Sequence, residues 1–277
     1  MNTETVNPLR QYFRRPALYL KLPSNGMGYS SDVLELPENG ELPVYPMTAI
    51  DEITTKTPDA LYNGTAVVEI IKSCIPGIKD PWQLLSTDLD PVLIAIRIAS
   101  NGQLMEIITD CPSCSEESKY DVNLTQMLGL LKAGDYGTPM NINDLQIKFH
   151  PLKYSQLNRA SESQFQIQRL LAGLNNIIDE QERNDASASA LKEINELAMN
   201  LLLETIEYVK TPEAIVFEKE FIREFLLNCD NKDYIRIRDA NVELRKSTEL
   251  KPLEIKCIHC NHAYEQMFNI NVTDFFG

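Results

Sequence analysis

Two Cys-x-x-Cys pairs constrain the fold of this chain more than any other feature of its sequence. Cys111 and Cys114 form the first pair, Cys257 and Cys260 form the second, and 142 residues lie between Cys114 and Cys257. Four thiolates can hold one Zn²⁺ in a tetrahedron, and each pair suits a tight knuckle at the tip of a β-hairpin. If the pairs meet, the chain folds back on itself and the residues between them form an insertion.

The sequence around both pairs predicts the strands that such knuckles need. Strands are expected at 104–109 and 120–124 around the first pair, and at 251–256 and 263–269 around the second. A site with four thiolates has no open coordination position, so the predicted zinc would be structural rather than catalytic. Iron in place of zinc is an alternative, as are a redox-active pair, disulfides formed after cell lysis, and free thiols.

Histidines could also take part in the predicted site. His259 and His262 lie beside the second pair, and either could replace a cysteine as a ligand, although four thiolates are already available. No apolar run approaches the roughly 18 to 20 residues of a membrane span, and residues 1–15 contain no apolar signal-peptide core. We therefore expect a cytoplasmic, reducing environment, in which paired cysteines are more naturally metal ligands than disulfides.

The first half of the chain predicts a small hairpin followed by buried helices. Asn39-Gly40 is a hairpin turn signal between short alternating segments at 33–36 and 42–45. Helices are expected to begin at Thr57-Pro58, at Thr65, where Cys74 would be a small buried side chain, and near Thr87. The last of these contains Arg97, for which Asp51, Glu52 or Asp59 could provide a carboxylate partner. Residues 128–143 are expected to be a loop and residues 145–151 a strand.

The second half has helical periodicity. Apolar residues at helical spacing predict helices near 154–178, 186–209, 216–229 and 233–246. The predicted fold class is α+β, with zinc-ribbon-like β knuckles and buried helices. Residues 1–150 and 249–277 would form one discontinuous domain closed by the zinc site, and residues 151–248 an inserted helical subdomain. The apolar stripes of these helices could instead pack on a partner protein.

Charge and motif content exclude several classes of function. The chain has 40 acidic and 26 basic residues, a net charge of −14, which disfavours nucleic acid as a main partner. It contains no glycine-rich phosphate loop, no HExxH and no GxSxG, so we expect a protein that is not an enzyme and has no small-molecule substrate. Two regions near the termini are candidate partner contacts: the basic, aromatic set Arg10, Tyr12, Phe13, Arg14 and Arg15, and the apolar pair Phe275-Phe276.

Several motifs occur in order along the first half: PMTAIDE at 46–52, PDAL at 58–61 followed by Asn63-Gly64, SCIP at 73–76, DLD at 88–90 through LIAIR at 93–97, and the first Cys-x-x-Cys pair. With them, residues 17–125 resemble the baseplate hub protein family of T-even-type contractile-tail bacteriophages. The second pair and the Phe275-Phe276 ending are consistent with this resemblance, and the helices after residue 150 lie outside it.

The resemblance implies a non-enzymatic structural protein of the virion, located in the tail baseplate, assembled in the host cytoplasm and contacting other baseplate and hub proteins. A transient chaperone of hub assembly is the first alternative. A zinc-ribbon regulator that binds nucleic acid, and a thiol oxidoreductase with an exposed cysteine of low pKa, are alternatives from other classes.

Overall fold

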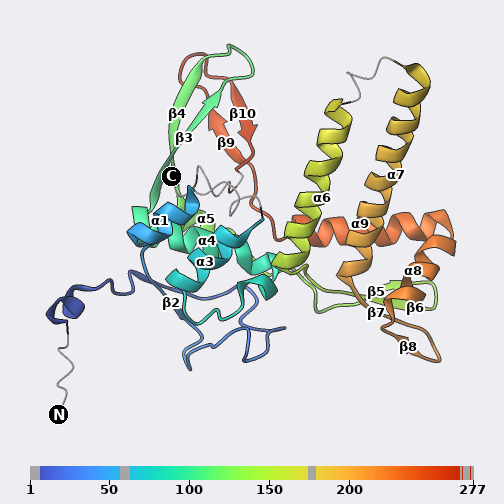
Figure 1. The fold of residues 1–277 in the computed structure, drawn as a ribbon, viewed down its shortest axis with the longest axis horizontal. Coiled ribbons are helices and arrows are strands. Elements are labelled where there is room, and N and C mark those ends of the chain that lie inside the picture. Colours follow the sequence, from blue (N-terminus) through green and yellow to red (C-terminus); the bar gives the residue numbers. More distant parts are fainter. Residues whose placement is uncertain (1–6, 57–62, 174–178, 269, 271–274, 276–277) are drawn as a thin grey trace.

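Two hydrophobic cores lie next to each other in this fold, and two β-hairpins rise from the first of them (Figure 1). A computed structural model describes residues 7–56, 63–173, 179–268, 270 and 275. Helices and short antiparallel sheets are mixed along the chain, in agreement with the predicted α+β class. The expected helix start at Thr57-Pro58 lies outside the described residues.

The elements of the first half are mostly short. In chain order they are η1 (Pro8–Tyr12), β1 (Leu18–Leu20), β2 (Leu42–Val44), α1 (Ala49–Thr55), α3 (Thr65–Cys74), η2 (Pro81–Gln83), α4 (Ser86–Asn101), β3 (Leu104–Asp110), β4 (Glu117–Asn123) and α5 (Leu124–Leu130). Helices α3 and α4 form the centre of the first core, because nearly all of their apolar side chains are buried. Cys74, at the end of α3, is among these buried side chains, as predicted.

The predicted hairpin around Asn39-Gly40 is wrong. Strand β2 pairs with β1, in the register Leu18↔Val44 and Leu20↔Leu42, and not with residues 33–36. Leu42 and Val44 are fully buried, so this pairing places the apolar side of β2 in the first core. Leu34 instead forms a single bridge with Ile78, in the turn that follows α3.

Gly64 fixes the start of α3. Its φ of +74° is in the left-handed region, and a Cβ atom at this position would lie 2.4 Å from Oδ1 of Asn158 and 2.8 Å from the hydroxyl oxygen of Tyr154. Both of these residues belong to α6 (Tyr154–Gly173), the first helix of the second half. A side chain at residue 64 would therefore force the Asn158 and Tyr154 side chains to move, in addition to the strain of the left-handed backbone.

Within the described residues, the second half combines a four-stranded antiparallel sheet and a two-stranded hairpin with four helices. Its elements are β5 (Met140–Ile142), β6 (Leu145–Phe149), α6, α7 (Glu180–Thr205), β7 (Ile206–Lys210), β8 (Ile215–Val216), α8 (Lys219–Asn228), α9 (Asn231–Lys246), β9 (Leu253–Lys256) and β10 (Ala263–Gln266). The sheet has the strand order β5-β6-β7-β8. Helices α6 and α7 form an antiparallel pair that projects from the body (Figure 1).

The second core is built on this sheet. Ile147, Ile206 and Val209 from the sheet pack with Ile222 of α8 and Ile237 of α9. The predicted division counted β5 and β6 with residues 1–150, whereas their side chains contribute to the second core. The division into a discontinuous domain and an inserted subdomain remains a prediction.

Candidate metal centre

The two Cys-x-x-Cys pairs lie at the tips of the two hairpins that rise from the first core (Figure 1). Strands β3 and β4 pair from Leu104↔Asn123 to Asp110↔Glu117, and β9 and β10 pair from Leu253↔Gln266 to Lys256↔Ala263. In both hairpins the turn begins at the first cysteine of the pair, as the sequence predicts.

The tip of the first hairpin is a tight knuckle. The backbone N–H of Cys111 donates to the carbonyl of Glu116 at 3.1 Å, and that of Ser115 donates to the carbonyl of Cys111 at 2.8 Å. The N–H of Ser113 points at the Cys111 sulfur at 3.4 Å. Ser115 has a φ of +58°, which closes the turn.

The second hairpin repeats this geometry at equivalent positions. The N–H of Cys257 donates to the carbonyl of His262 at 2.8 Å, and that of Asn261 donates to the carbonyl of Cys257 at 3.0 Å. The N–H of His259 points at the Cys257 sulfur at 3.4 Å, and Asn261 has a φ of +59°. Two segments far apart in sequence therefore form the same knuckle, and each directs two sulfurs toward the other.

The four sulfurs gather at one point. The Sγ atoms of Cys111 and Cys260 are 3.6 Å apart, those of Cys114 and Cys257 are 3.7 Å apart, and all four atoms lie within 4.8 Å of one another. A tetrahedral ion with metal–sulfur bonds of about 2.3 Å separates its sulfurs by about 3.8 Å. The four cysteines therefore fit a tetrahedral metal ion.

The ionisation of the four thiols favours binding of a cation between them. Backbone N–H groups of Cys260 and His259 stabilise the Cys257 thiolate and lower the pKa of Cys257 to about 6. At Cys114 the N–H of Glu116 also acts to lower the pKa, but burial and the neighbouring sulfurs outweigh it and raise the pKa to about 12. Ionising one thiol opposes ionisation of the next, and a divalent cation would compensate the accumulated negative charge.

The nearby histidines are not part of the cluster. Within the described chain, the group of side chains placed to share a metal ion consists of the four cysteines alone. His259 is exposed, and His262 stacks on the ring of Tyr264 with the ring centroids 6.3 Å apart. Cys74 is remote from the cluster, and burial together with Asp51 raises its pKa to about 12.

A family of known proteins covers most of the chain. The model of the family described as T4 bacteriophage base plate protein matches residues 32–277. The chain belongs to this base plate protein family. No curated protein and no solved structure matches it. The match includes both hairpins and the whole second half, so the helices after residue 150 also belong to the family pattern.

The match leaves out residues 7–15, which we call the N-terminal arm of this base plate protein. The arm contains η1 and extends away from the body (Figure 1). Tyr12 is 78% exposed and Phe13 is 59% exposed, and the side chains of Arg10 and Arg15 are exposed as well. Four of the five predicted arm contacts are therefore accessible to a partner.

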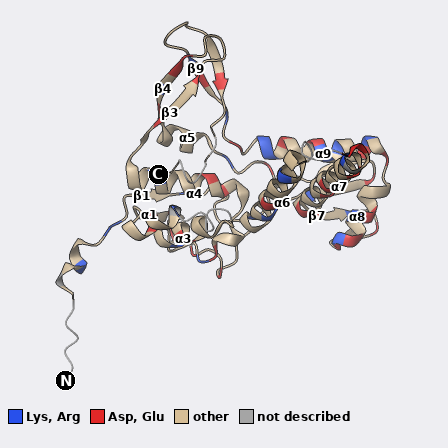
Figure 2. Ribbon diagram, turned by 45° about the horizontal axis from the view of Figure 1, so that its top comes forward, with Lys and Arg blue, Asp and Glu red and all other residues tan. Residues whose placement is uncertain are grey.

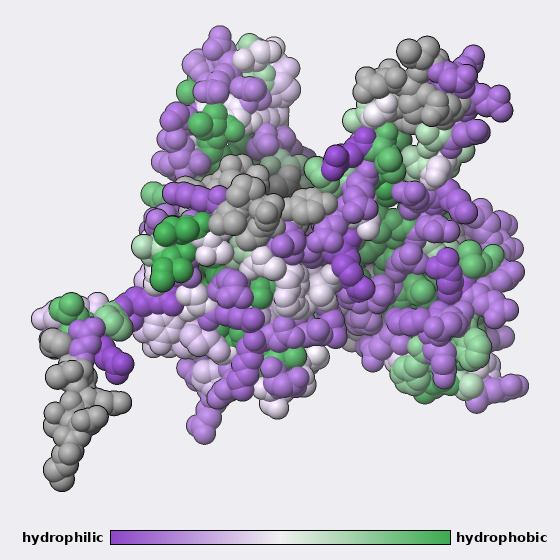
Figure 3. Space-filling view, in the orientation of Figure 1, coloured by the Kyte–Doolittle hydropathy of each residue, from purple (hydrophilic) through white to green (hydrophobic). Residues whose placement is uncertain are grey.

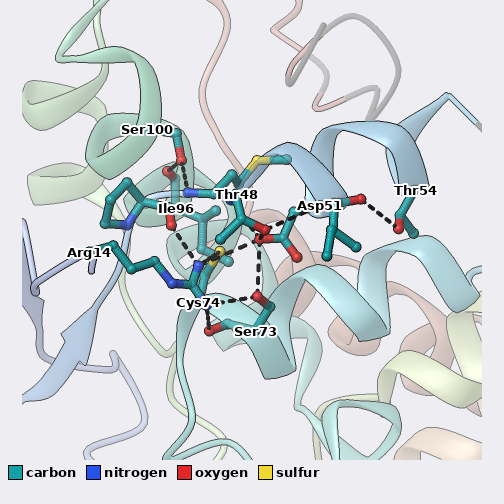
Figure 4. Close-up of polar contacts among 11 residues, drawn as sticks. Arg14, Thr48, Asp51, Thr54, Ser73, Cys74, Ile96 and Ser100 are labelled. Carbon is teal, nitrogen blue, oxygen red and sulfur yellow. Dashed lines mark hydrogen bonds and ion pairs between the residues drawn. The ribbon is translucent and has the colours of Figure 1, made fainter. Parts of the chain in front are cut away.

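Arg14, the fifth of them, is turned toward its own chain (Figure 4). Its guanidinium donates to the carbonyl of Pro46 at 2.6 Å, and to the carbonyl and hydroxyl of Ser73 at 2.7 and 2.9 Å. The carboxylate of Asp51 lies 3.5 Å away. Arg14 therefore fixes the base of the arm to α1 and α3.

Of the three carboxylates that the sequence offers as partners for Arg97, Asp51 is used elsewhere. Asp51 accepts from the backbone N–H of Thr48 at 2.7 Å in a capping box at the start of α1, and it also pairs with Arg14. The Nε and Nη1 atoms of Arg97 are buried without a hydrogen-bond partner in the described structure, and this burial lowers the pKa of Arg97. Asp59, another predicted partner, lies outside the described residues.

Phe275 is part of the first core of this base plate protein. Its side chain is 1% exposed, and its ring meets the ring of Phe268 edge-on with the centroids 6.2 Å apart. The Phe275 ring is therefore buried inside its own chain and is not exposed to a partner, unlike the contact that the sequence suggests. Phe276 lies outside the described residues. No described helix is both long enough and apolar enough to span a membrane.

Proposed function

We propose that the chain is a non-enzymatic structural component of the hub of a contractile-tail baseplate, in which a Cys₄ zinc clamp joins the two hairpins. The convergence of four sulfurs from distant parts of a base plate protein is the observation that carries this proposal. Zn²⁺ is the proposed ion because a closed set of four thiolates at tetrahedral spacing is typical of structural zinc.

The clamp stiffens a joint in this proposal. It holds β3–β4 against β9–β10, and the arm and the exposed helix faces contact other baseplate and hub proteins. The hairpins are poorly suited to nucleic acid, because residues 104–123 contain five acidic side chains and a single lysine. Figure 2 marks acidic residues in red along the ribbon of both hairpins.

Quantitative mass spectrometry of purified virions tests the location. We expect the chain in virions at a fixed ratio to the other baseplate proteins, and cross-linking should join it to hub subunits. A chain found only in infected-cell assembly intermediates would instead identify a hub-assembly chaperone.

Complementation tests the clamp in the same system. A phage that cannot make this chain should form infectious particles when the wild type or Cys229→Ser is supplied, and should fail with Cys114→Ser. Cys229 is the matched control because it lies outside the sulfur cluster. Equal rescue by both variants would contradict a role for the clamp in assembly.

A further inference from the structure

The N-terminal arm carries an exposed apolar surface with positive charge. Leu9, Tyr12 and Phe13 are each more than half exposed. Residues 7–21 contain three arginines and a lysine but no acidic side chain, in a chain of net charge −14. The ribbon of the described part of the arm is accordingly blue in places and nowhere red in Figure 2.

The base of the arm is held while its outer part makes few contacts. The hydrogen bonds of Arg14 tie the base to the first core. Arg10 in the outer part and Arg15 next to the anchor form no ion pair with any described residue. Aromatic residues and arginines are enriched at protein–protein interfaces and contribute much of their binding energy. Their exposure together on this short segment therefore indicates an interaction surface.

A second exposed apolar surface lies on the second core, where β8 leads into α8. It is formed by Ile215, Phe217 and Phe221, with Phe217 56% exposed and Phe221 61% exposed. We call these three residues the β8–α8 patch. The ring of Phe217 rests edge-on against Tyr208 of β7, which fixes one side of the patch. Figure 3 shows hydrophobic atoms gathered over this end of the molecule.

The surroundings of this patch are acidic. Glu213, Glu220 and Glu224 are exposed around it. Lys210 pairs with Ile215 across the sheet and is exposed. The other two nearby cations bind their own chain, because Lys219 donates to the carbonyls of Leu203 and Ile206, and Arg223 donates to Oδ1 of Asn200 at 2.7 Å. The exposed charge beside the patch is therefore mainly negative.

The arm and the patch complement each other but cannot meet within one molecule. They lie at opposite ends of the structure (Figures 1 and 3), and Arg14 holds the base of the arm on the first core. We propose that the N-terminal arm of one copy docks on the β8–α8 patch of a second copy. Such a contact joins two different surfaces, so it leads head-to-tail to a ring or a chain of copies.

The apolar side chains and the charges have separate roles in this contact. Burial of Tyr12, Phe13 and the phenylalanines of the patch provides most of the affinity. Exposed arginine–glutamate pairs add little free energy but orient the partners and speed their encounter, which makes the association weaker at high salt. Because the arm is short, we expect a weak contact that is strengthened when many copies are held together.

This inference builds on the arm contact in the proposed function and names its partner as another copy of the chain. The two can fail separately. Absence of the chain from virions would contradict the structural role and leave self-association unaffected, whereas a monomeric purified protein that is nevertheless present in virions would contradict this inference alone.

Two complementary variants of the full-length, metal-loaded chain test the contact. The arm variant carries Arg10→Glu, Tyr12→Ser and Phe13→Ser, and the patch variant carries Phe217→Ser, Phe221→Ser and Glu220→Arg. All six side chains are exposed, so circular dichroism and metal content should match the wild type. Sedimentation velocity should show the wild type growing in mass with concentration and each variant remaining monomeric.

The mixture of the two variants gives the sharpest result. The patch variant still has an intact arm and the arm variant an intact patch, so together they should form a 1:1 dimer that grows no further. Lys119→Glu, on the first hairpin, is the control and should associate like the wild type. A wild type that stays monomeric at all concentrations overturns the proposal, and so does a mixture that stays monomeric while the wild type associates.

Discussion

The hydroxyl of Thr109 donates a 2.8 Å hydrogen bond to Oε1 of Gln266, a residue 157 positions later in the chain. The bond joins β3 to β10 below the sulfur cluster. The Tyr120 hydroxyl adds a second link at 3.3 Å, to the carbonyl of Lys256. The two hairpins therefore contact each other through polar groups of their strands as well as through the cysteines.

Thr109→Val should test this link. Valine keeps the shape of the buried threonine but leaves Oε1 of Gln266 without its donor, so the free energy of unfolding should fall by about 1 kcal/mol. Urea denaturation of the metal-loaded protein measures the change. The exposed Thr125→Val is the control, for which we expect a change within about 0.5 kcal/mol. Equal losses in both variants would show that the bond does not hold the hairpins together.

Cys114→Ser and Cys257→Ser should each abolish binding of a single metal ion. The two residues come from different hairpins, so either substitution removes one of four ligands from the same site. Structural zinc contributes roughly 10 kcal/mol or more in small zinc domains, so the hairpin pair should also lose its ordered packing. Elemental analysis gives the metal content, with Cys229→Ser as the control. If either cysteine variant keeps a full complement of metal, the long-range pairing is wrong.

Arg14→Gln should loosen the base of the arm. It removes a charged donor from two carbonyls and leaves Asp51, whose side chain is only 9% exposed, without its ion pair. We expect the free energy of unfolding to fall by about 2 kcal/mol, and proteolysis after Arg10 to become faster. The neighbouring Arg15→Gln is exposed and should change stability by less than about 0.5 kcal/mol. Similar losses for both would exclude an anchoring role.

Asp90 should make the protein less stable as the pH rises. It borders a cavity of about 150 Å³ between α4 and the segment after α9, and burial together with Glu249 raises its pKa from 3.8 to about 6. The native state therefore binds an additional proton between about pH 4 and pH 6, and stability falls with increasing pH across this window.

Asp90→Asn removes this dependence. Its stability relative to the wild type should increase from pH 4 to pH 6 and then level off, with a gain on the order of 2 kcal/mol at pH 7. Denaturation midpoints at several pH values measure the difference between the two proteins. Parallel pH profiles would show that Asp90 titrates with an ordinary pKa.

Phe275→Ala should destabilise the first core. The fully buried ring packs on Phe268, and its removal leaves a cavity, so we expect a loss of about 4 kcal/mol. The exposed Phe221→Ala is the matched control and should cost less than about 0.5 kcal/mol in dilute protein. A small effect of Phe275→Ala would mean that the first core does not depend on this ring.

The sequence predicted the knuckles because their signal is local. Cysteine spacing and alternating strands on both sides lie within about twenty residues, and helices α3, α4, α6, α8 and α9 were equally evident from their apolar periodicity. Which cysteines lie together in space depends on contacts between distant parts of the chain. This grouping could be predicted only because the sequence contains two matching pairs. The metal itself remains part of the proposal.

Other elements were missed where local patterns were ambiguous. Residues 206–210 continue the apolar stripe of α7, so periodicity could not show that Ile206 begins strand β7. Helix α5 was expected to be partly loop, because Gly129 and later glycines weaken its helical pattern. The strand partner of Leu42 and the ion-pair partner of Asp51 depend on tertiary packing, which turn signals and charge counts do not contain.

The sulfur cluster also determines how the chain would carry mechanical load. With the proposed metal ion bound, a pulling force applied before Cys111 on one side and after Cys260 on the other would cross from β3 to β10 through the metal–sulfur bonds. The 142 residues between Cys114 and Cys257, which include the whole second core, would bear none of that tension. A subunit of this kind can transmit force through its hairpins while the sheet and helices between them remain relaxed.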